Sequence, residues 1–313
     1  MSKIVGIGAN VYDTLITVPS YPTEDTKLRA SGVKECGGGP CATGLVAAAK
    51  LGASAAYIGA LAKDGGGDFL YKDMQRFGMT NEFVDVVGGK SSFSSYVVLS
   101  EKNATRTCVF NKENLPDFTL DDKKKKAIAD ADVLMVDGNE LENAVEGAKY
   151  ARQNGTKVLY DAGGLYDGIE RLLPYADILI PSEEFALAHT GKSDAAEAAK
   201  ALFDKYLPQV VVVTQGVKGG VIYDGKSAKT YPSFKVEALD SNGAGDVFHG
   251  AFAFSVIMGY NYYDACIFSS AVSALKCTKL GARDGVPTFL ETVEFLKERG
   301  YNGKTCRRRE QKI

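Results

Sequence analysis

The sequence has few of the residues that metal-binding and disulfide-linked proteins use. Its six cysteines include no Cys-x-x-Cys pair and no regular spacing, and the chain has only two histidines, His189 and His249. A zinc site made of cysteine and histidine therefore has few available ligands. Cysteines scattered in this way behave as small hydrophobic residues in a reducing compartment.

Long apolar runs and an excess of charge of one sign are also missing. No stretch of 18 apolar residues occurs, and the N-terminus, MSKIVGIGANVYDTL, lacks the basic region, apolar run and cleavage site of a signal peptide. The net charge is −2, and the basic run at 307–309 fits a solvated tail. We therefore expect a cytoplasmic protein with neither a nucleic-acid nor a membrane partner.

Proline is scarce, whereas glycine is abundant. The chain has 9 prolines and 34 glycines among 313 residues, which indicates many tight turns and close backbone approaches. Hydrophobic residues make up 45% and charged residues 24%, a balance that excludes a disordered chain.

The order of apolar segments predicts an α/β fold. Short, nearly continuous apolar strands alternate with helices, which indicates a parallel sheet covered on both faces. Segment 91–111 partly alternates apolar and polar residues, as in a hairpin with one exposed face, and the irregular segment 14–36 is expected to join it in a small β appendage. The expected strands are 3–8, 55–60, 133–138, 157–163, 177–182 and 209–216, and the expected helices are 42–51, 68–77, 140–153, 167–174, 183–205, 244–258, 262–279 and 288–298.

Two glycine-rich segments match phosphate-binding motifs only in part. Gly6-Ile7-Gly8 lacks the third glycine of a dinucleotide fingerprint, because Val11 stands in its place. Segment 220–227, GVIYDGKS, has the letters of a P-loop, but its middle residues have the pattern of a strand and Pro232 follows. A P-loop must open a helix, so we expect Lys226 in a hairpin turn instead.

A third segment, DSNGAGD at 240–246, has the context of an anion site. A strand end is expected to turn here into a long helix, so that the N–H groups of Gly243, Ala244 and Gly245 would form a hollow at a helix N-terminus. Asp246 is either an ordinary acidic residue of a first helical turn or a base that takes the proton of an alcohol. The residues alone leave both interpretations open.

Three segments together resemble the signatures of the ribokinase-like (PfkB) carbohydrate kinase family. DSNGAGDVFHGAF resembles its D-T-x-G-A-G-D signature, GGGPCATGLVAAAKLGA resembles its glycine turn and following helix, and VVVTQGVKGG resembles its T-x-G-x-x-G nucleotide segment. They occur in the order and spacing of the family, and the resemblance covers nearly the whole chain.

The resemblance implies an architecture and a set of ligands. The implied fold is a doubly wound, mostly parallel α/β sheet with helices on both faces, in a single domain over residues 1–313. Segments of about 14–36 and 91–111 would form a small β-sheet lid that closes over the sugar and pairs two subunits in a homodimer. The implied ligands are ATP, Mg²⁺ and a small sugar.

The resemblance also implies roles for individual residues. Asp246 would be the catalytic base, beside an anion hole for the γ-phosphoryl group formed by Gly243, Ala244 and Gly245. The ATP side would include Thr214, Gly216 and Gly219. The sugar side would include Asn10, Asp13, Gly38, Gly39 and Arg106.

Two positions depart from the family pattern. Thr43 stands where the family commonly has a sugar-binding asparagine. In the segment that matches the family's N-x-x-E motif, which is linked to magnesium and phosphate, Phe185 stands in the place of the glutamate. Glu183 is the carboxylate left there as a candidate metal ligand.

The motifs favour a ketose-type substrate. The GGGP turn, GAGDVFHGA and the segment ALKCT-x-x-GAR are similar to sulfofructose kinases, and YPTED is similar to ketohexokinases. We therefore expect ATP-dependent phosphorylation of a primary hydroxyl of a ketose or ketose derivative. A nucleoside kinase of the same fold is the near alternative, disfavoured because the lid segment lacks an obvious aromatic pair that would stack a base. A non-catalytic sugar or nucleotide sensor is the alternative from another class.

Overall fold

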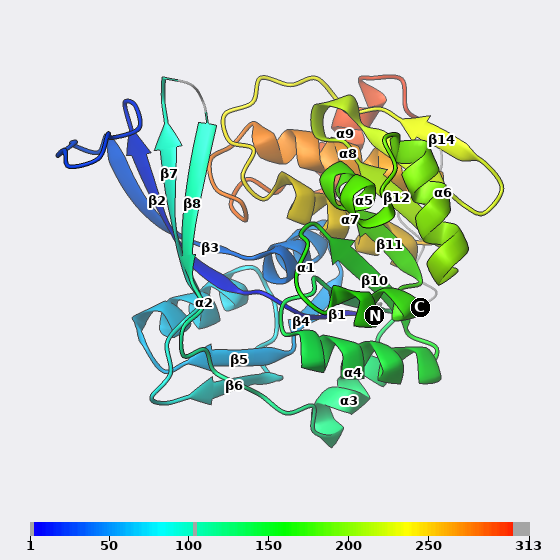
Figure 1. Ribbon diagram of the computed structural model, residues 1–313, viewed down its shortest axis with the longest axis horizontal. Coiled ribbons are helices and arrows are strands. Elements are labelled where there is room, and N and C mark those ends of the chain that lie inside the picture. The colour runs from blue at the N-terminus through cyan, green and yellow to red at the C-terminus, as the bar shows by residue number, and fades with distance from the viewer. Residues whose placement is uncertain (1–2, 103–104, 303–313) are drawn as a thin grey trace.

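The computed structural model describes residues 3–102 and 105–302, and a large mostly parallel sheet lies at its centre (Figure 1). The strand order is β14-β13-β12-β11-β10-β9-β1-β4. β13 pairs antiparallel with both β12 and β14, and all the other neighbouring strands pair in parallel. The sheet and its predicted parallel character are confirmed. Its strands are β1 (Lys3–Ile7), β4 (Ser54–Tyr57), β9 (Val133–Val136), β10 (Lys157–Ala162), β11 (Ile178–Pro181), β12 (Val210–Thr214), β13 (Gly220–Tyr223) and β14 (Ala228–Tyr231).

Helices cover both faces of this sheet because neighbouring side chains of each strand point to opposite sides. In β9, Val133 and Met135 belong to one core, whereas Leu134 and Val136 belong to the other. The first core includes side chains of α1 (Pro40–Leu51), α2 (Gly65–Arg76), α7 (Ala244–Ile257), α8 (Tyr262–Cys277) and α9 (Phe289–Lys297). The second includes side chains of α3 (Asp122–Ala129), α4 (Leu141–Gln153), α5 (Glu183–Thr190) and α6 (Ala195–Tyr206). No helix among the described residues is both long and apolar enough to cross a membrane.

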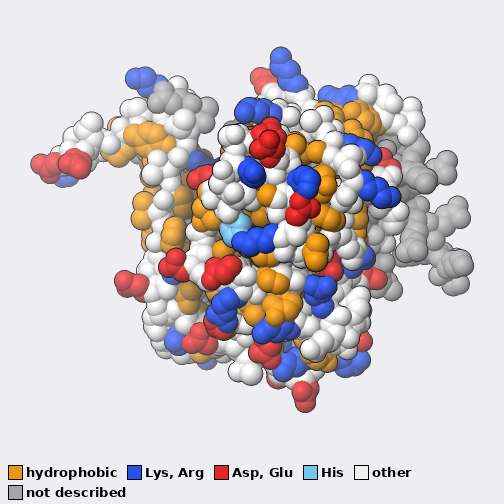
Figure 2. Space-filling model, turned by 45° about the vertical axis from the view of Figure 1, so that its right-hand side comes forward, with side chains coloured by type: hydrophobic (Ala, Val, Ile, Leu, Met, Phe, Trp, Pro, Cys, Tyr) orange, Lys and Arg blue, Asp and Glu red, His pale blue; other side chains and the backbone are white. Residues whose placement is uncertain are grey.

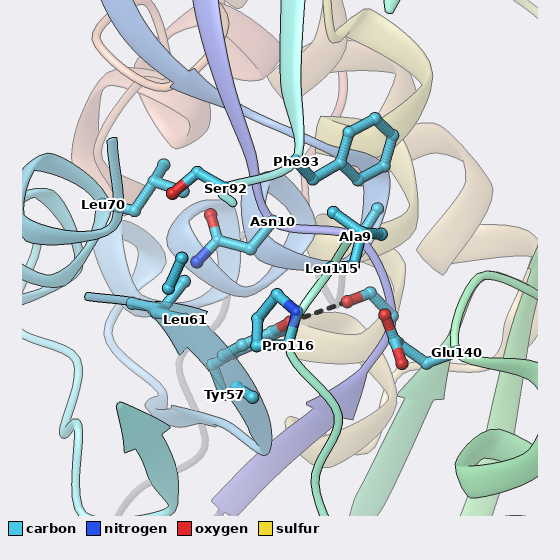
Figure 3. A pocket seen from close by; sticks show the side chains of 13 residues that line it. Ala9, Asn10, Tyr57, Leu61, Leu70, Ser92, Phe93, Leu115, Pro116 and Glu140 are labelled. Carbon is cyan, nitrogen blue, oxygen red and sulfur yellow. Dashed lines mark hydrogen bonds between the residues drawn. The ribbon is translucent and has the colours of Figure 1, made fainter. Parts of the chain in front are cut away.

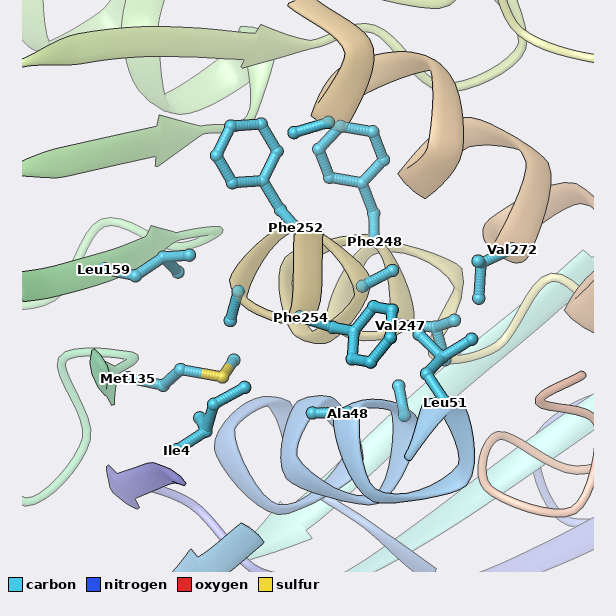
Figure 4. Close-up of a cluster of buried hydrophobic side chains, with 14 of the residues drawn as sticks. Ile4, Ala48, Leu51, Met135, Leu159, Val247, Phe248, Phe252, Phe254 and Val272 are labelled. Carbon is cyan, nitrogen blue, oxygen red and sulfur yellow. The ribbon is translucent and has the colours of Figure 1, made fainter. Parts of the chain in front are cut away.

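Helices α1 and α7 cross closely because glycine faces glycine. A Cβ atom on Gly250 would lie 1.9 Å from the carbonyl oxygen of Gly44, far inside the 3.0 Å that Cβ atoms keep from other heavy atoms. Around this contact, Phe252 and Phe254 of α7 pack in the same core as Leu51 of α1 (Figure 4). Because α1 follows the glycine turn and α7 begins at the predicted anion hollow, the crossing brings these two segments together.

A second sheet of four strands projects from the main body and matches the predicted lid (Figure 1). This lid sheet has the order β3-β2-β7-β8, formed by β2 (Val11–Val18), β3 (Gly32–Gly38), β7 (Ser94–Ser100) and β8 (Thr105–Asn111). The predicted hairpin is confirmed as β7 and β8. The segment expected to be irregular instead contributes two strands, which begin at Val11 and end at Gly38. Residues 103–104 of the hairpin turn and the basic run at 307–309 lie outside the described residues.

Two expected helices have a different form in the structure. The helix expected at 183–205 is divided into α5 and α6, because Gly191 ends α5 in a left-handed conformation and the Asp194 carboxylate accepts hydrogen bonds from the first N–H groups of α6. The helix expected at 167–174 is replaced by two short 3₁₀ turns, Ile169–Arg171 and Leu173–Tyr175.

Two expected strands also differ. The strand expected at 55–60 is divided into β4 and β5 (Gly59–Ala62), and β5 pairs with β6 (Val84–Val87) in a separate sheet. The strand end expected before the anion hollow is absent, since residues 232–239 form no strand. Instead, the N–H groups of Leu239 and Asp240 donate to the carbonyl oxygen of Cys277 at the end of α8.

Candidate active site

The candidate site lies where the strand order reverses. β1 and β9 are neighbours, yet the chain passes from β1 to the β4 side of the sheet and from β9 to the β10 side. Open α/β sheets bind ligands at the carboxyl ends of strands beside such a reversal. Asn10 follows β1 and Asp137 follows β9 at this place.

The residues of the predicted anion hollow lead directly into α7, as the sequence predicts. Gly243 precedes the helix with φ of 74°, a left-handed conformation that favours glycine, and Ala244 and Gly245 form the first helical residues. Among the described residues, nothing outside the neighbouring backbone of its own helix lies within 4 Å of the position that a Cβ atom on Gly245 would occupy. The helix N-terminus therefore has free space beside it for an anion.

Asp246 is the third residue of α7, and its carboxyl group has a raised pKa. Burial, followed by the charge of Asp161, raises the pKa of Asp246 to about 7, while the charges of His249 and Arg106 oppose this rise. A carboxyl group that titrates near neutral pH can take a proton from an alcohol in a transition state.

Two buried residues next to Asp246 were not predicted as part of the site. Asp161 lies in β10, and its Oδ2 is 3.1 Å from Nδ1 of His249. Burial raises the pKa of Asp161, and the charge of Asp137 adds to this. Nδ1 of His249 also lies 2.6 Å from the carbonyl oxygen of Gly245, and its Nε2 lies 3.1 Å from that of Ile180. The imidazole thus links the first turn of α7 to the ends of β10 and β11.

Asp137 is a third buried residue of the site that was not predicted. It accepts hydrogen bonds from the backbone N–H groups of Ala9 at 2.8 Å and of Cys41 at 3.0 Å. These bonds join the end of β9 to the loop after β1 and to the first turn of α1. Burial raises the pKa of Asp137, and the hydrogen bonds from Ala9, Asn139 and Cys41 oppose this rise.

Asp13 and the glycine turn lie against each other. Asp13 in β2 is 7% exposed and accepts a hydrogen bond from Oγ of Ser95 at 2.6 Å. Burial raises its pKa, whereas the Ser95 hydrogen bond and the charge of Arg283 lower it. A Cβ atom on Gly38 would lie 1.9 Å from Oδ2 of Asp13, so only glycine permits this approach. Gly39 then precedes α1 with φ of 90°.

A narrow pocket, partly open to solvent, lies beside Asn10 (Figure 3). Its lining includes Asn10, Tyr57, Phe93 and Glu140, and the hydroxyl of Tyr57 donates to the carbonyl oxygen of Gly8 at 2.8 Å. Burial raises the pKa of Glu140 to about 7, with a contribution from Asp137. Glu140 was not predicted, and Asn10 is the predicted sugar-side residue that lines this pocket.

The other sugar-side candidates lie in different settings. Thr43 is fully buried in α1, and its Oγ1 has no hydrogen-bond partner among the described residues. Its Cγ2 is 3.5 Å from the position of a Cβ atom on Gly243, so it lies beneath the anion hollow. Arg106 is exposed on β8, and its charge is among those that lower the pKa of Asp246.

The predicted nucleotide residues follow the end of β12. Oγ1 of Thr214 donates to the carbonyl oxygen of Pro181 at 3.4 Å, and Gly216 and Gly219 have φ of 57° and 86°. Glu183 lies beside this loop, where it accepts a hydrogen bond from Nε2 of Gln215 at 2.7 Å. The described part of the chain contains no group of three or more His, Cys, Asp or Glu side chains that could hold a metal ion.

The P-loop interpretation is excluded by the local structure. The residues before Lys226 form β13 and those after it form β14, and these two strands pair as an antiparallel hairpin. Within the turn, Oδ1 of Asp224 accepts hydrogen bonds from the N–H groups of Lys226 and Ser227. No helix follows the lysine, so the helix N-terminus that a P-loop needs is missing from residues 228–243.

Comparisons with known proteins agree with this geometry. A family model described as pfkB family carbohydrate kinase matches residues 1–289. The chain is 27% identical over 301 residues to ribokinase from Haemophilus influenzae, covering 93% of this chain and 97% of that protein. It is 25% identical over 297 residues to ketohexokinase from Mus musculus, covering 91% and 98%. Its structure is similar to that of ribokinase from Thermotoga maritima, with a TM-score of 0.83, 25% identity and coverage of 95% and 100%.

Proposed function

Because the chain belongs to the pfkB family of carbohydrate kinases, we propose that it transfers the γ-phosphoryl group of ATP to a primary hydroxyl of a ketose or ketose derivative of the fructose or sulfofructose type. The observation that carries the proposal is Asp246, whose pKa is raised toward neutrality by burial and which lies next to the open helix N-terminus at Gly243–Gly245. We further propose that residues 1–313 form one kinase domain located in the cytoplasm.

Phosphoryl transfer asks the protein mainly to position its substrates and to stabilise charge. In the proposed mechanism, Asp246 accepts the proton of the attacking hydroxyl, and the N–H groups of Gly243, Ala244 and Gly245 hold the transferred phosphoryl oxygens. Because Asp246 immediately follows these residues, the base and the anion hole are held by one helical turn. The contacts of His249 with Gly245 and Asp161 keep that turn against the sheet.

The nucleotide is assigned to the loop after β12, with Thr214, Gly216 and Gly219 as its contacts. The two positive φ angles let the backbone turn sharply there. Glu183 retains acceptor capacity beyond its bond to Gln215 and fits a Mg²⁺ ion held mainly by ATP phosphates. Mg²⁺ would neutralise phosphate charge when bound.

The sugar is assigned to the space between the lid sheet and the strand reversal. We assign Asn10, Asp13, Gly38 and Gly39 to the sugar. Asn10 and Glu140 line the pocket, where the Glu140 carboxyl group would accept hydrogen bonds from sugar hydroxyls. Arg106 on the lid sheet and Thr43 beneath the anion hollow complete the proposed set.

The proposal is tested by measuring ADP release from the purified protein with ATP, Mg²⁺ and a substrate panel. The panel contains fructose, sulfofructose, ribose, a deoxyketonic sugar acid and two nucleosides. We expect the highest kcat/KM with a ketose-type compound. A higher kcat/KM with ribose would support a sugar kinase but overturn the assignment of a ketose substrate. A higher kcat/KM with a nucleoside would favour the nucleoside kinase. No turnover with any compound, despite measurable ATP binding, would favour the sensor.

Replacing Asp13 with alanine is expected to raise the KM for the sugar by about tenfold or more, since hydrogen bonds to a buried charge are stronger than neutral ones. The KM for ATP should change little, because the nucleotide is assigned to the loop after β12. Saturation curves for both substrates on the best sugar measure this. A shift of the ATP curve alone would show that the two halves of the site are assigned in reverse.

We also propose that the protein is a homodimer that pairs through the lid sheet. Tyr96, Val109 and Phe110 in β7 and β8 are more than half exposed, and hydrophobic side chains gather on this projecting sheet (Figure 2). Exposed apolar residues on a sheet edge favour pairing with another chain. Light scattering during size-exclusion chromatography should give twice the mass of 33.4 kDa, and a monomer mass would contradict the dimer.

A further inference from the structure

One buried arginine joins the parts of the proposed sugar site. Arg283, in the loop after α8, is 1% exposed. Its Nη2 donates to Oδ1 of Asn10 at 2.8 Å and to the carbonyl oxygen of Gly38 at 2.5 Å. Its Nη1 donates to Oδ2 of Asp73 in α2 at 2.7 Å. A single guanidinium group therefore holds the loop after β1, the glycine turn and α2 together.

The surroundings are shaped to this guanidinium group. A Cβ atom on Gly37 would lie 2.1 Å from Nη1 of Arg283 and 2.4 Å from Oδ2 of Asp73. Glycine at position 37 thus gives the ion pair its space. The three acceptors lie around a planar fork of donors, which the compact ammonium group of a lysine does not reproduce. Loss of the arginine would leave the Asp73 carboxylate buried without this partner.

The same loop also contacts the anion hollow. The N–H group of Gly281 donates to Oδ2 of Asp240 at 2.8 Å, and Oδ1 of Asp240 accepts from the N–H group of Asn242. The Cβ atom of Ala282 lies 2.6 Å from the position of a Cβ atom on Gly243. Consecutive residues of one short loop therefore support the anion hollow and, through Arg283, the glycine turn.

We propose that Arg283 is a positioning residue that holds Asn10 and Gly38 in register with the anion hollow and thereby sets the affinity for the sugar. This inference rests on the proposed function. Arg283 acts through Asn10 and the Gly38 carbonyl group, and it leaves the nucleotide loop after β12 untouched. Its removal should therefore act on the KM for the sugar far more than on the KM for ATP.

The test compares three variants with the wild-type protein on the best sugar of the panel. R283K keeps the charge but loses the planar fork, and G37A displaces the guanidinium group without changing any charge. R76M is the matched control, because Arg76 donates to the other oxygen of Asp73 at 2.8 Å but has a side chain that is 58% exposed. Because the Arg76 guanidinium group stays largely in water, its bonds to Asp73 and to Asp284 are expected to contribute less than the fully buried pair of Arg283 with Asp73.

We expect R283K and G37A to raise the KM for the sugar by about tenfold or more, with the ATP affinity measured by calorimetry nearly unchanged. R76M should resemble wild type in both. A sugar KM near the wild-type value in folded R283K would overturn the proposal, as would equal losses of sugar and ATP affinity, which indicate general destabilisation. If either R283K or G37A fails to fold, the sugar KM of the other variant still tests the proposal. Wild-type turnover on the panel tests the proposed function separately.

Discussion

Asp246→Asn is expected to bind ATP normally and to lose about 10²–10⁴-fold in kcat, the usual contribution of a positioned general base. The amide has the shape of the carboxylate but cannot accept the proton of the attacking hydroxyl. Saturation kinetics and ATP calorimetry on the purified variant measure both effects. More than a third of wild-type turnover would mean that Asp246 is only an acidic residue of a first helical turn.

Asp264→Asn is the matched control for this alternative. Asp264 also lies in a first helical turn, that of α8, where its N–H group donates to the side chain of Asn261. A carboxylate at this place interacts favourably with the helix dipole, which is worth well under the effect expected for a base. The control should therefore keep nearly full activity.

The pH dependence gives a second readout of the same assignment. Burial and the charge of Asp161 raise the pKa of Asp246 to about 7, so its basic form dominates above this pH and is lost below it. The kcat/KM of the wild-type enzyme should accordingly fall as the pH drops through about 7. A flat profile down to pH 5 would contradict a base with this pKa.

The residues that the sequence identifies most securely are those that act within one short segment. The turn at Gly243–Gly245, the helix that follows it and Asp246 are neighbours in the chain, so their relation in space follows from helix geometry alone. The P-loop interpretation of segment 220–227 can be rejected on the same local evidence, because the residues on both sides of Lys226 form strands. Alternation of apolar strands and helices is likewise enough to predict the parallel sheet with two covered faces.

The residues that the sequence does not identify meet only through the fold. Asp137 and Asp161 each end an apolar strand pattern, a signal that could have marked them, but their approach to Asp246 depends on the strand order. Arg283 contacts Asp73 across 210 positions and Asn10 across 273, and no local pattern records such pairs. The break between α5 and α6 is a different case. Gly191 and Asp194 are local signals for it, but the prediction followed the helical periodicity of 183–205 instead.

The crossing of α1 and α7 shows how the packing of the core controls the site. Gly44 and Gly250 let the two backbones touch, and the Cβ atoms that other residues would add have no room. Each helix starts at one half of the proposed site, at Gly39 and at Gly243. The distance between the glycine turn and the anion hollow is therefore set by a backbone contact, which cannot adjust as a flexible side chain can.

Gly250→Ala is expected to lower both stability and activity. Alanine favours a helix over glycine by about 1 kcal/mol. Its Cβ atom, however, would lie 1.9 Å from the Gly44 carbonyl oxygen, so α1 and α7 must separate. Overpacking of this kind costs about 1–3 kcal/mol or more, and the upper part of this range applies because the obstructing atoms are backbone. We therefore expect a net loss in the free energy of unfolding, measured by urea denaturation.

The loss of activity should exceed the loss of stability, because a displacement of about 1 Å between reacting groups can lower a rate by about 10²-fold. Gly65→Ala in α2 is the control. It makes the same chemical change at a helical glycine whose added Cβ atom would meet no described residue within 4 Å apart from the nearby backbone of its own helix. The control should keep wild-type kcat and should be as stable as wild type or slightly more so. If Gly250→Ala matched it in both measurements, the backbone contact between α1 and α7 would not determine the geometry of the site.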